Sequence, residues 1–124
     1  MRDFKGLKVW QRSHRLTVDV YKATEAFPHH ERFGLTNQMR RACLSIPANI
    51  AEGCGRTSQR DFGRFLQMSV GSVNELEYHL LLAHDLGYLN SALHSSFCSD
   101  LGEVRQMLSG LIRRVGKDAA LSRG

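Results

Sequence analysis

Apolar side chains recur every three or four residues along most of this chain of 124 residues. Positions spaced in this way lie on one face of an α-helix, so each such stretch predicts an amphipathic helix with one buried face. Four stretches have this spacing: Val9, Ser13, Leu16, Val20, Ala23 and Phe27; Leu35, Met39, Ala42, Ile46 and Ile50; Phe62, Leu66, Ser69, Val73, Leu76, Leu80 and Ala83; and Phe97, Leu101, Val104, Leu108, Leu111 and Val115. No stretch alternates apolar and polar residues between turn signals, so the pattern predicts an all-α fold.

Local signals place the ends of these helices. Pro28 ends the first helix, because the residue before a proline avoids helical backbone angles. The second helix is expected to begin near residues 34–36 and to stop at residues 53–55, where glycines accept the left-handed conformation that closes many helices. Ser58, followed three residues later by Asp61, has the capping-box pattern that opens a helix.

The last two helices are bounded in the same way. Gly87 closes the third helix, which spans residues 58–86, and Asn90 is the expected N-cap of the fourth. Residues 119–124 are expected to fray. Short connections force consecutive helices to run antiparallel, so the sequence predicts one domain, residues 1–124, folded as an up-down-up-down four-helix bundle.

The first and third helices carry more apolar residues than one buried face needs. Leu7 and Val18 belong to the extra row on the first helix, and Leu82 belongs to the row on the third. Apolar surface on two faces suggests a contact between subunits, and the alternative is a wide core face with an apolar rim. The candidate interface residues are Trp10, Tyr21, Phe65 and Met68.

Basic residues are concentrated in the first half of the chain. Residues 1–64 hold twelve Lys and Arg against six Asp and Glu, whereas residues 65–124 hold five against six. A field of one sign can hold a polyanion, because each phosphate that is neutralised releases counterions. The alternative is a solvated surface whose charges pair within helices. The candidate nucleic-acid contacts are Lys8, Arg12, Arg15, Arg40, Arg41, Arg56, Arg60 and Arg64.

Residues of the types that carry catalysis or bind metals form no known pattern. Glu75 and Glu77 precede His79 by four and two residues, so neither makes the Glu-x-x-His pair of a di-metal bundle. Cys54, in a glycine-flanked turn beside Arg56, is the one suggestive case of a thiol that a cation could hold as a thiolate. Cys43 and Cys98 sit within helical segments and are expected to be small buried residues. No phosphate loop or nucleophile motif is present. The sequence therefore predicts no catalytic residue, no metal site and no cofactor.

One segment inside the second helix is unusual. Pro47 removes an amide donor and leaves the carbonyl of Cys43 without its helical partner, which favours a kink. Asn49 and Glu52 lie close by on one face. These polar groups either form a patch for a partner or satisfy one another and a neighbouring helix, and we favour the second interpretation.

The chain lacks the features of a membrane or exported protein. No window approaches the roughly eighteen uninterrupted apolar residues of a membrane span, and the N-terminal residues have no signal-peptide core. Three cysteines, at positions 43, 54 and 98, are an odd number with no close spacing. They are expected to be reduced thiols in a cytoplasmic protein.

Motifs in all four helices match those of a known family. They are residues 8–11, 33–36, 38–42, 45–53 with Gly55 and Arg56, 65–66, 75–77 and 108–112. On these motifs the chain resembles a bacterial four-helix-bundle family, some of whose members are encoded by intervening sequences in ribosomal RNA genes. A relative of that family is the accessory variability determinant of diversity-generating retroelements.

The resemblance implies an assembly, but it does not imply the retroelement role of the relative. The relative resembles a barrel of five bundles, has a basic surface, and works with a reverse transcriptase and nucleic acid. The resemblance therefore implies a cytoplasmic homo-oligomer, a ring with five subunits as the expected number, and it carries over no catalytic residue. Cysteines at positions 43 and 54 are small departures that change no charge.

Two functions follow from these observations. The first is a non-catalytic oligomeric adaptor that binds RNA or DNA, or a nucleic-acid enzyme such as a reverse transcriptase, through its basic half. The second is a scaffold that binds only proteins and whose positive charge aids solubility. A deep polar pocket enclosed by the bundle would favour a third possibility, an enzyme acting on a small molecule.

Overall fold

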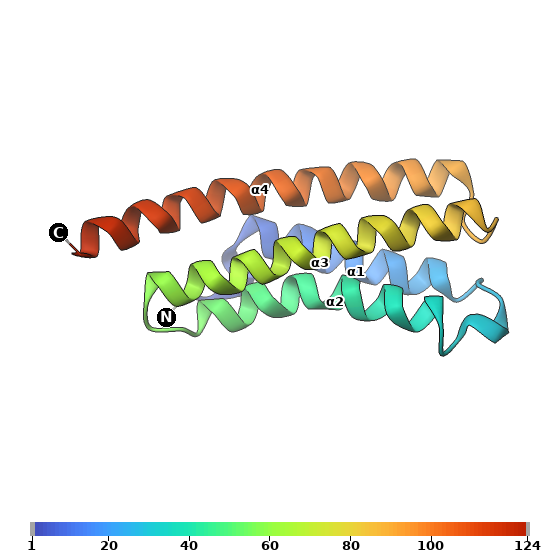
Figure 1. Ribbon diagram of the computed structural model, residues 1–124, viewed down its shortest axis with the longest axis horizontal. Coiled ribbons are helices and arrows are strands. Elements are labelled where there is room, and N and C mark those ends of the chain that lie inside the picture. The colour runs from blue at the N-terminus through green and yellow to red at the C-terminus, as the bar shows by residue number, and fades with distance from the viewer. Residues whose placement is uncertain (1, 124) are drawn as a thin grey trace.

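The computed structural model describes residues 2–123, with the side chains of residues 2–121. Two short 3-10 helices precede the first and second α-helices, and no strand occurs in residues 2–123. The predicted all-α fold with four helices is therefore confirmed. The elements are η1 (Phe4–Gly6), α1 (Lys8–Thr24), η2 (His29–Glu31), α2 (Leu35–Cys54), α3 (Gln59–Asp85) and α4 (Ser91–Arg123) (Figure 1).

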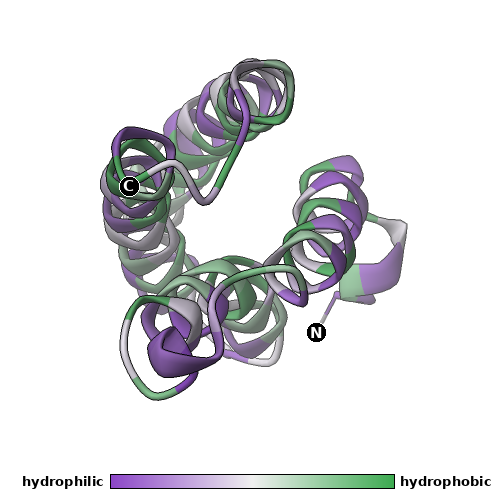
Figure 2. Ribbon diagram, turned by 90° about the vertical axis from the view of Figure 1, so that its right-hand side faces the viewer, coloured by the Kyte–Doolittle hydropathy of each residue, from purple (hydrophilic) through white to green (hydrophobic). Residues whose placement is uncertain are grey.

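The four helices pack around a shared interior (Figure 2). Each helix contacts the helix that follows it, and α4 returns to contact α1, whereas the diagonal pairs make no close contact within the described residues. Consecutive helices run in opposite directions, so both chain ends lie at the same end of the bundle (Figure 1). The arrangement agrees with the predicted up-down bundle.

The predicted apolar seams form the core. Every seam residue named from the sequence is buried except Ala23, which is partly buried. Leu16, Ile46, Leu76 and Leu108 come from four different helices, and each is at most 1% exposed. Burying one face of each helix removes apolar surface from water, which is the main favourable contribution to folding of a bundle of this kind.

Three of the predicted helix ends are confirmed. The Ser58 hydroxyl oxygen accepts a hydrogen bond from the backbone N–H of Asp61 at 3.0 Å, and the Asn90 side chain accepts one from Leu93 at 2.8 Å. These bonds satisfy amides that the first turn of a helix leaves without partners. Gly87, with φ of 79°, occupies the left-handed region after α3.

Other helix ends differ from the prediction. The first helix stops at Thr24 instead of continuing to Phe27. The fourth is helical to Arg123, which includes most of the segment expected to fray, and Gly124 lies outside the described residues.

The glycines near the end of α2 also have a different role from the one predicted. Neither Gly53 nor Gly55 has a positive φ, and Gly53 lies inside the last turn of the helix. A Cβ atom at Gly53 would lie 2.9 Å from both Phe62 Cδ1 and Phe65 Cβ. Glycine at this position therefore allows close packing of α2 against α3, and does not provide a left-handed cap.

The polar groups around Pro47 satisfy one another and the neighbouring helices, as the favoured interpretation held. The Cys43 carbonyl, which loses its helical donor at Pro47, lies 3.4 Å from Thr17 Oγ1 of α1, which shares its one hydrogen with the Ser13 carbonyl at 2.7 Å. The Ser45 hydroxyl donates to the Ser72 hydroxyl of α3 at 2.6 Å, and Asn49 donates to the Ser45 carbonyl at 2.9 Å. This segment therefore joins α2 to both adjacent helices.

Candidate nucleic-acid interface

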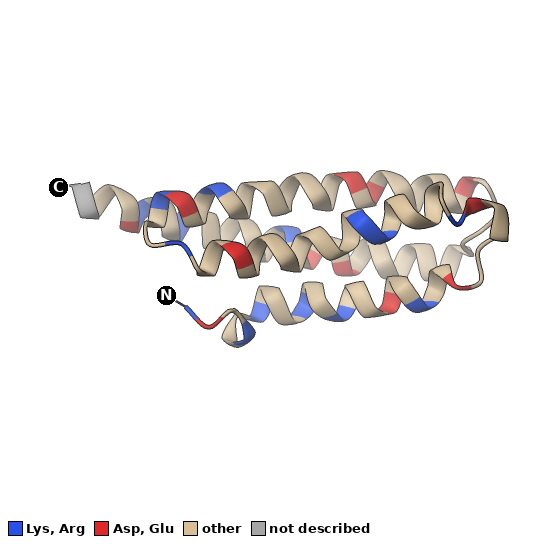
Figure 3. Cartoon of the chain, turned by 90° about the horizontal axis from the view of Figure 1, so that it is seen from below, with Lys and Arg blue, Asp and Glu red and all other residues tan. Residues whose placement is uncertain are grey.

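Charge is divided along the length of the bundle. The half that carries the chain ends, here called the termini half, comprises residues 2–15, 46–70 and 106–121, and the opposite half comprises residues 16–45 and 71–105. The termini half has eleven Lys and Arg against four Asp and Glu, whereas the opposite half has five against eight. Lys and Arg gather toward the end with the chain termini in Figure 3. The basic field is therefore a property of one end of the fold.

Three of the predicted cations form ion pairs within the chain. Arg12 of α1 pairs with Glu103 of α4. Arg56 pairs with Glu52 at 2.7 Å, and Arg64 pairs with Asp61 at 3.4 Å. These side chains are all at least one third exposed, so each pair contributes little to stability and can open to a phosphate.

Arg40 is held between α1 and α2. Its Nε donates to the Thr24 hydroxyl at 2.8 Å, its Nη2 donates to the Tyr21 carbonyl at 3.1 Å, and its guanidinium lies 4.8 Å from the centre of the Tyr21 ring. These contacts supply donors and positive charge at the C-terminal end of α1, where backbone carbonyls lack helical partners. Arg40 therefore has a structural role and belongs to the opposite half.

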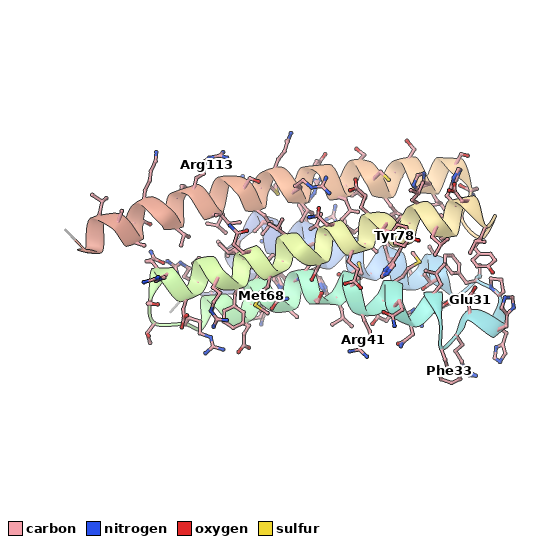
Figure 4. The ribbon with its side chains drawn as sticks, in the orientation of Figure 1. Glu31, Phe33, Arg41, Met68, Tyr78 and Arg113 are labelled. Carbon is pink, nitrogen blue, oxygen red and sulfur yellow. The ribbon has the colours of Figure 1, made fainter. Side chains whose placement is uncertain are left out.

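Four predicted cations make no ion pair, hydrogen bond or ring contact in the described part of the chain: Lys8, Arg15, Arg41 and Arg60. Lys8, Arg15 and Arg60 belong to the termini half. Arg41 projects from α2 on the side of the bundle away from Arg113 (Figure 4). The structure thus places most of the predicted cations at one end of the bundle, in two groups, one on α1 and one at or just before the start of the diagonal helix α3, and leaves Arg40 and Arg41 apart.

A basic groove between α1 and α4 includes three cations that the sequence analysis missed. The groove, of about 730 Å³, lies between the start of α1 and the last turns of α4. We call it the α1–α4 groove, and its basic residues are Lys8, Arg113, Arg114 and Lys117. The α1 helix also begins without a side-chain cap and without an acidic residue in its first turn, so its positive dipole end adds to the field.

The basic residues of α4 do not stand out when charges are counted separately for residues 1–64 and 65–124. Residues 65–124 are nearly neutral as a set, although Arg113, Arg114 and Lys117 lie within little more than one helical turn. Their close spacing could have identified these cations in the sequence. The antiparallel order of the helices, which brings the end of the fourth helix back to the start of the first, could have placed them beside Lys8.

A second, smaller groove lies on the other side of α4. It has a volume of about 360 Å³ and is lined by Arg60 and Arg64 of α3 and by Ile112 and Val115 of α4. Asp61 also lines it, so its charge is mixed. The termini half therefore presents basic residues on both sides of α4.

The four candidate interface residues have different surroundings. Trp10 is partly buried, with its ring stacked on His14 at 4.9 Å between centroids. Tyr21 lies under Arg40, and Phe65 is only 8% exposed because the guanidinium groups of Arg56 and Arg64 lie 4.6 and 4.8 Å from its ring centre. Met68 is 47% exposed (Figure 4). Of these four residues, Met68 offers the most free apolar surface.

The cysteines lie in environments that disfavour a thiolate. Burial raises the pKa of Cys43 to about 12, and burial also raises the pKa of Cys54 and Cys98. Cys54 is the last residue of α2 and is buried, so the turn position expected from the sequence is wrong. The nearby Arg2 opposes the upward shift in the pKa of Cys54 without overcoming it. The geometry therefore gives no support to a cysteine nucleophile.

Two further kinds of site, a metal-binding cluster and a membrane-spanning helix, are absent from the described residues. The described residues contain no cluster of three or more His, Cys, Asp or Glu arranged to hold a metal ion. Within the described chain, every helix is too short or too polar to cross a lipid bilayer.

Comparisons with other proteins agree with the resemblance seen in the sequence. Residues 5–110 match the 23S rRNA-intervening sequence protein family. The fold is similar to the crystal structure of a protein of unknown function from the S23 ribosomal protein family of Bacteroides thetaiotaomicron, with a TM-score of 0.76 and 28% sequence identity. That similarity covers 84% of this chain and 97% of the other. No curated protein matches the chain.

Proposed function

The chain belongs to the 23S rRNA-intervening sequence protein family, and we propose that it is a non-catalytic, self-associating adaptor that binds the phosphate backbone of RNA or DNA. The observation that carries the proposal is the charge division, with eleven cations against four carboxylates in the termini half. A polyanion would approach that half and be repelled from the other, because their net charges have opposite signs.

The state of the individual cations supports this function. Lys8, Arg15 and Arg60 have no partner in the described part of the chain, so binding a phosphate requires them to give up only water. Arg56 and Arg64 lie against Phe65, which limits their movement and positions both guanidinium groups near one ring. Partly fixed cations lose less side-chain entropy on binding than flexible ones.

The expected binding does not depend on base sequence. Lys and Arg side chains that contact phosphate oxygens fix the position of a nucleic acid and carry no direct sequence information. The α1–α4 groove adds apolar Leu7 and Met107 but no aromatic ring on which a base could stack.

Filter binding of mixed-sequence RNA and DNA to the full chain tests the proposal. If about four phosphates are neutralised, affinity should fall roughly 100-fold between about 50 mM and about 200 mM salt. Similar affinities for unrelated sequences are expected. Failure of both RNA and DNA to bind at the lower salt concentration would remove the nucleic-acid function.

Exposed apolar residues support the self-association and favour a second candidate, a scaffold that binds only proteins. Met68, Tyr78 and Leu81 of α3 are 47%, 59% and 46% exposed. Tyr78 and Leu81 border a shallow groove of about 410 Å³ that includes His94 and Cys98 of α4. Tyr78 and Leu81 are one helical turn apart, and neighbouring exposed apolar residues of this kind are typical of protein contacts. Protein capture that survives nuclease and high salt, with no nucleic-acid binding, would favour the scaffold.

Light scattering tests the self-association. The proposal expects a mass several times the 14.0 kDa of one chain, with five subunits as the number implied by the resemblance. Met68→Glu should lower the mass, because a carboxylate cannot be buried in an apolar contact without a partner. A monomer at all accessible concentrations would contradict self-association.

A further inference from the structure

We infer that the α1–α4 groove is the seat of the phosphodiester backbone, where one strand of nucleic acid lies between Lys8 on one side and Arg113, Arg114 and Lys117 on the other. This inference rests on the proposed function and assigns it a site. Three of its four cations lie within residues 113–117, and so outside residues 1–64, where the sequence concentrates its basic residues.

The composition of the lining favours an anion. Ten residues line the groove; four are Lys or Arg and none is Asp or Glu. The second groove, beside α3, contains Asp61, and the groove near Tyr78 contains Glu77. A carboxylate in the lining would repel a phosphate, so among these surfaces the α1–α4 groove has the strongest attraction for one.

The four cations are also free to bind. Lys8, Arg113, Arg114 and Lys117 form no ion pair, hydrogen bond or ring contact in the described part of the chain. Asp118, which follows Lys117, accepts a hydrogen bond from Gln59 of α3 at 3.4 Å and so is directed to the other side of α4. Four like charges gathered without a counter-ion repel one another, and a bound phosphate chain relieves that repulsion.

The shape of the groove suits an extended chain of phosphates. Its apolar floor includes Leu7, Val9, Met107 and Leu111, with the basic side chains around it. Gly6 has no atom within 4 Å of where its Cβ would be, and at Gly110 the nearest atom is Arg113 Nη2 at 3.9 Å. Neither glycine adds a side chain to the groove. A volume of about 730 Å³ with cations on two elements can hold more than a single phosphate group.

Anisotropy of a fluorescent single-stranded RNA, measured with the full chain, tests this assignment. The double variant Arg113→Gln/Arg114→Gln is compared with Lys22→Gln/Arg41→Gln, which removes two unpaired cations from the opposite half. The groove variant should bind about 10-fold or more weakly at low salt, and its salt slope should fall by about 2. The control variant should lose less than about threefold, because its charges act only at long range.

A second measurement locates the contact in the unmodified protein. In an NMR titration with the same RNA, backbone amides of residues 6–9 and 107–117 should shift most. Circular dichroism should show the same melting curve for both double variants, since all four replaced side chains are exposed.

The outcomes separate the site from the function. If the wild type binds RNA and the two double variants lose affinity equally, the groove assignment is overturned but nucleic-acid binding stands. The same holds if the largest NMR shifts on RNA addition lie outside the groove. Displacement of RNA by millimolar inorganic phosphate at constant ionic strength would identify a single-phosphate site and overturn the backbone assignment. No binding by the wild type would overturn both.

Discussion

The two halves of the bundle are built from the same four helices but use their charges differently. In the opposite half, charged groups hold the structure together: Arg105 donates to Glu77 and Asn74, both at 3.1 Å, and Arg40 joins α1 to α2. In the termini half, Arg12, Arg56 and Arg64 form exposed ion pairs, but a larger group of cations, which includes Lys8 and Arg113, has no partner within the described chain. Among the described residues, the unpaired cations of the opposite half are fewer and include Lys22 and Arg41. The difference teaches that the number of cations on a surface matters less than whether the fold has already paired them.

Glu31 shows the same structural use of charge at the far end of the opposite half. Its carboxylate accepts hydrogen bonds from the backbone N–H of Leu35 at 3.1 Å and from the Tyr88 hydroxyl at 3.0 Å. It therefore ties the start of α2 to the turn between α3 and α4. The Leu35 and Tyr88 bonds lower the pKa of Glu31, because both stabilise its charged form.

The largest expected effect tests the packing that supports the termini half. Gly53→Ala places a Cβ 2.9 Å from two phenylalanine side chains, so the helices must move apart or the rings must shift. We expect the free energy of unfolding to fall by about 1 to 3 kcal/mol. Gly71→Ala is the matched control, since no atom lies within 4 Å of its Cβ position, and it should raise stability by about 0.5 to 1 kcal/mol. Equal effects in urea denaturation would contradict the packing role of Gly53.

Arg40 and Arg41 are adjacent in the sequence, and comparing them tests whether a cation with hydrogen-bond partners stabilises the fold more than an unpaired one. Arg40→Leu removes the donors to Thr24 and Tyr21 and should lower the free energy of unfolding by about 1 to 2 kcal/mol. Arg41→Leu removes an exposed, unpaired cation and should change it by less than about 0.5 kcal/mol. Thermal denaturation of the two variants makes the comparison, and a larger loss for Arg41→Leu would contradict it.

The next largest effect is a fall in the free energy of unfolding at acidic pH, where Glu31 becomes protonated. Because the pKa of Glu31 is lower in the folded state than in the unfolded chain, its contribution is present above the ordinary glutamate pKa and is lost as the pH falls through the folded value. The Glu31→Gln variant should show a weaker pH dependence in that acidic range. Denaturation curves at several acidic pH values measure it, and an unchanged dependence would remove Glu31 as a cause.

His79 should produce a related effect nearer to neutral pH. Burial lowers its pKa, partly opposed by Glu75 at 3.7 Å, and its Nδ1 is buried without a hydrogen-bond partner within the described residues. The unfolded chain therefore binds a proton more readily, so stability is lost as the pH falls below the ordinary histidine pKa. His79→Gln should flatten this part of the curve. Urea denaturation of both proteins across the histidine titration range measures this, and a variant that keeps the full pH dependence of the wild type would contradict the assignment to His79.

The smallest expected effect concerns stability in the termini half. Lys117→Gln should change the free energy of unfolding by less than about 0.5 kcal/mol, because the side chain has no partner to lose in the described chain. The same variant should reduce the salt slope of RNA binding by about 1. A marked loss of stability would show that this end, too, uses its charges structurally.

Much of the fold could be predicted because the signals are local. The apolar spacing identified all four helices, and Ser58 and Asn90 marked two helix starts through bonds to amides three residues away. The role of Gly53 could not be predicted in this way. A glycine near a helix end has the same appearance in sequence whether it adopts a left-handed conformation or admits a ring from another helix.

The candidate site was predicted only in part for a similar reason. Lys8, Arg56, Arg60 and Arg64 do lie in the termini half, but Arg40 is held between helices, and the groove residues of α4 were missed. Phe65 was selected as exposed surface and is covered by two arginines from its own chain. Apart from the contact between Arg64 and its neighbour Phe65, these outcomes depend on contacts between residues far apart in the sequence or on opposite sides of a turn.

The amino-acid order alone therefore determined four amphipathic helices, their buried faces and an excess of positive charge. These properties arise from the helical period and from side-chain chemistry within a few positions. Tertiary structure decided where the charge collects and which cations remain unpaired. It did so because antiparallel packing returns Arg113 and its neighbours on α4 to Lys8 on α1, and gives Arg12 and Arg40 partners on adjacent helices.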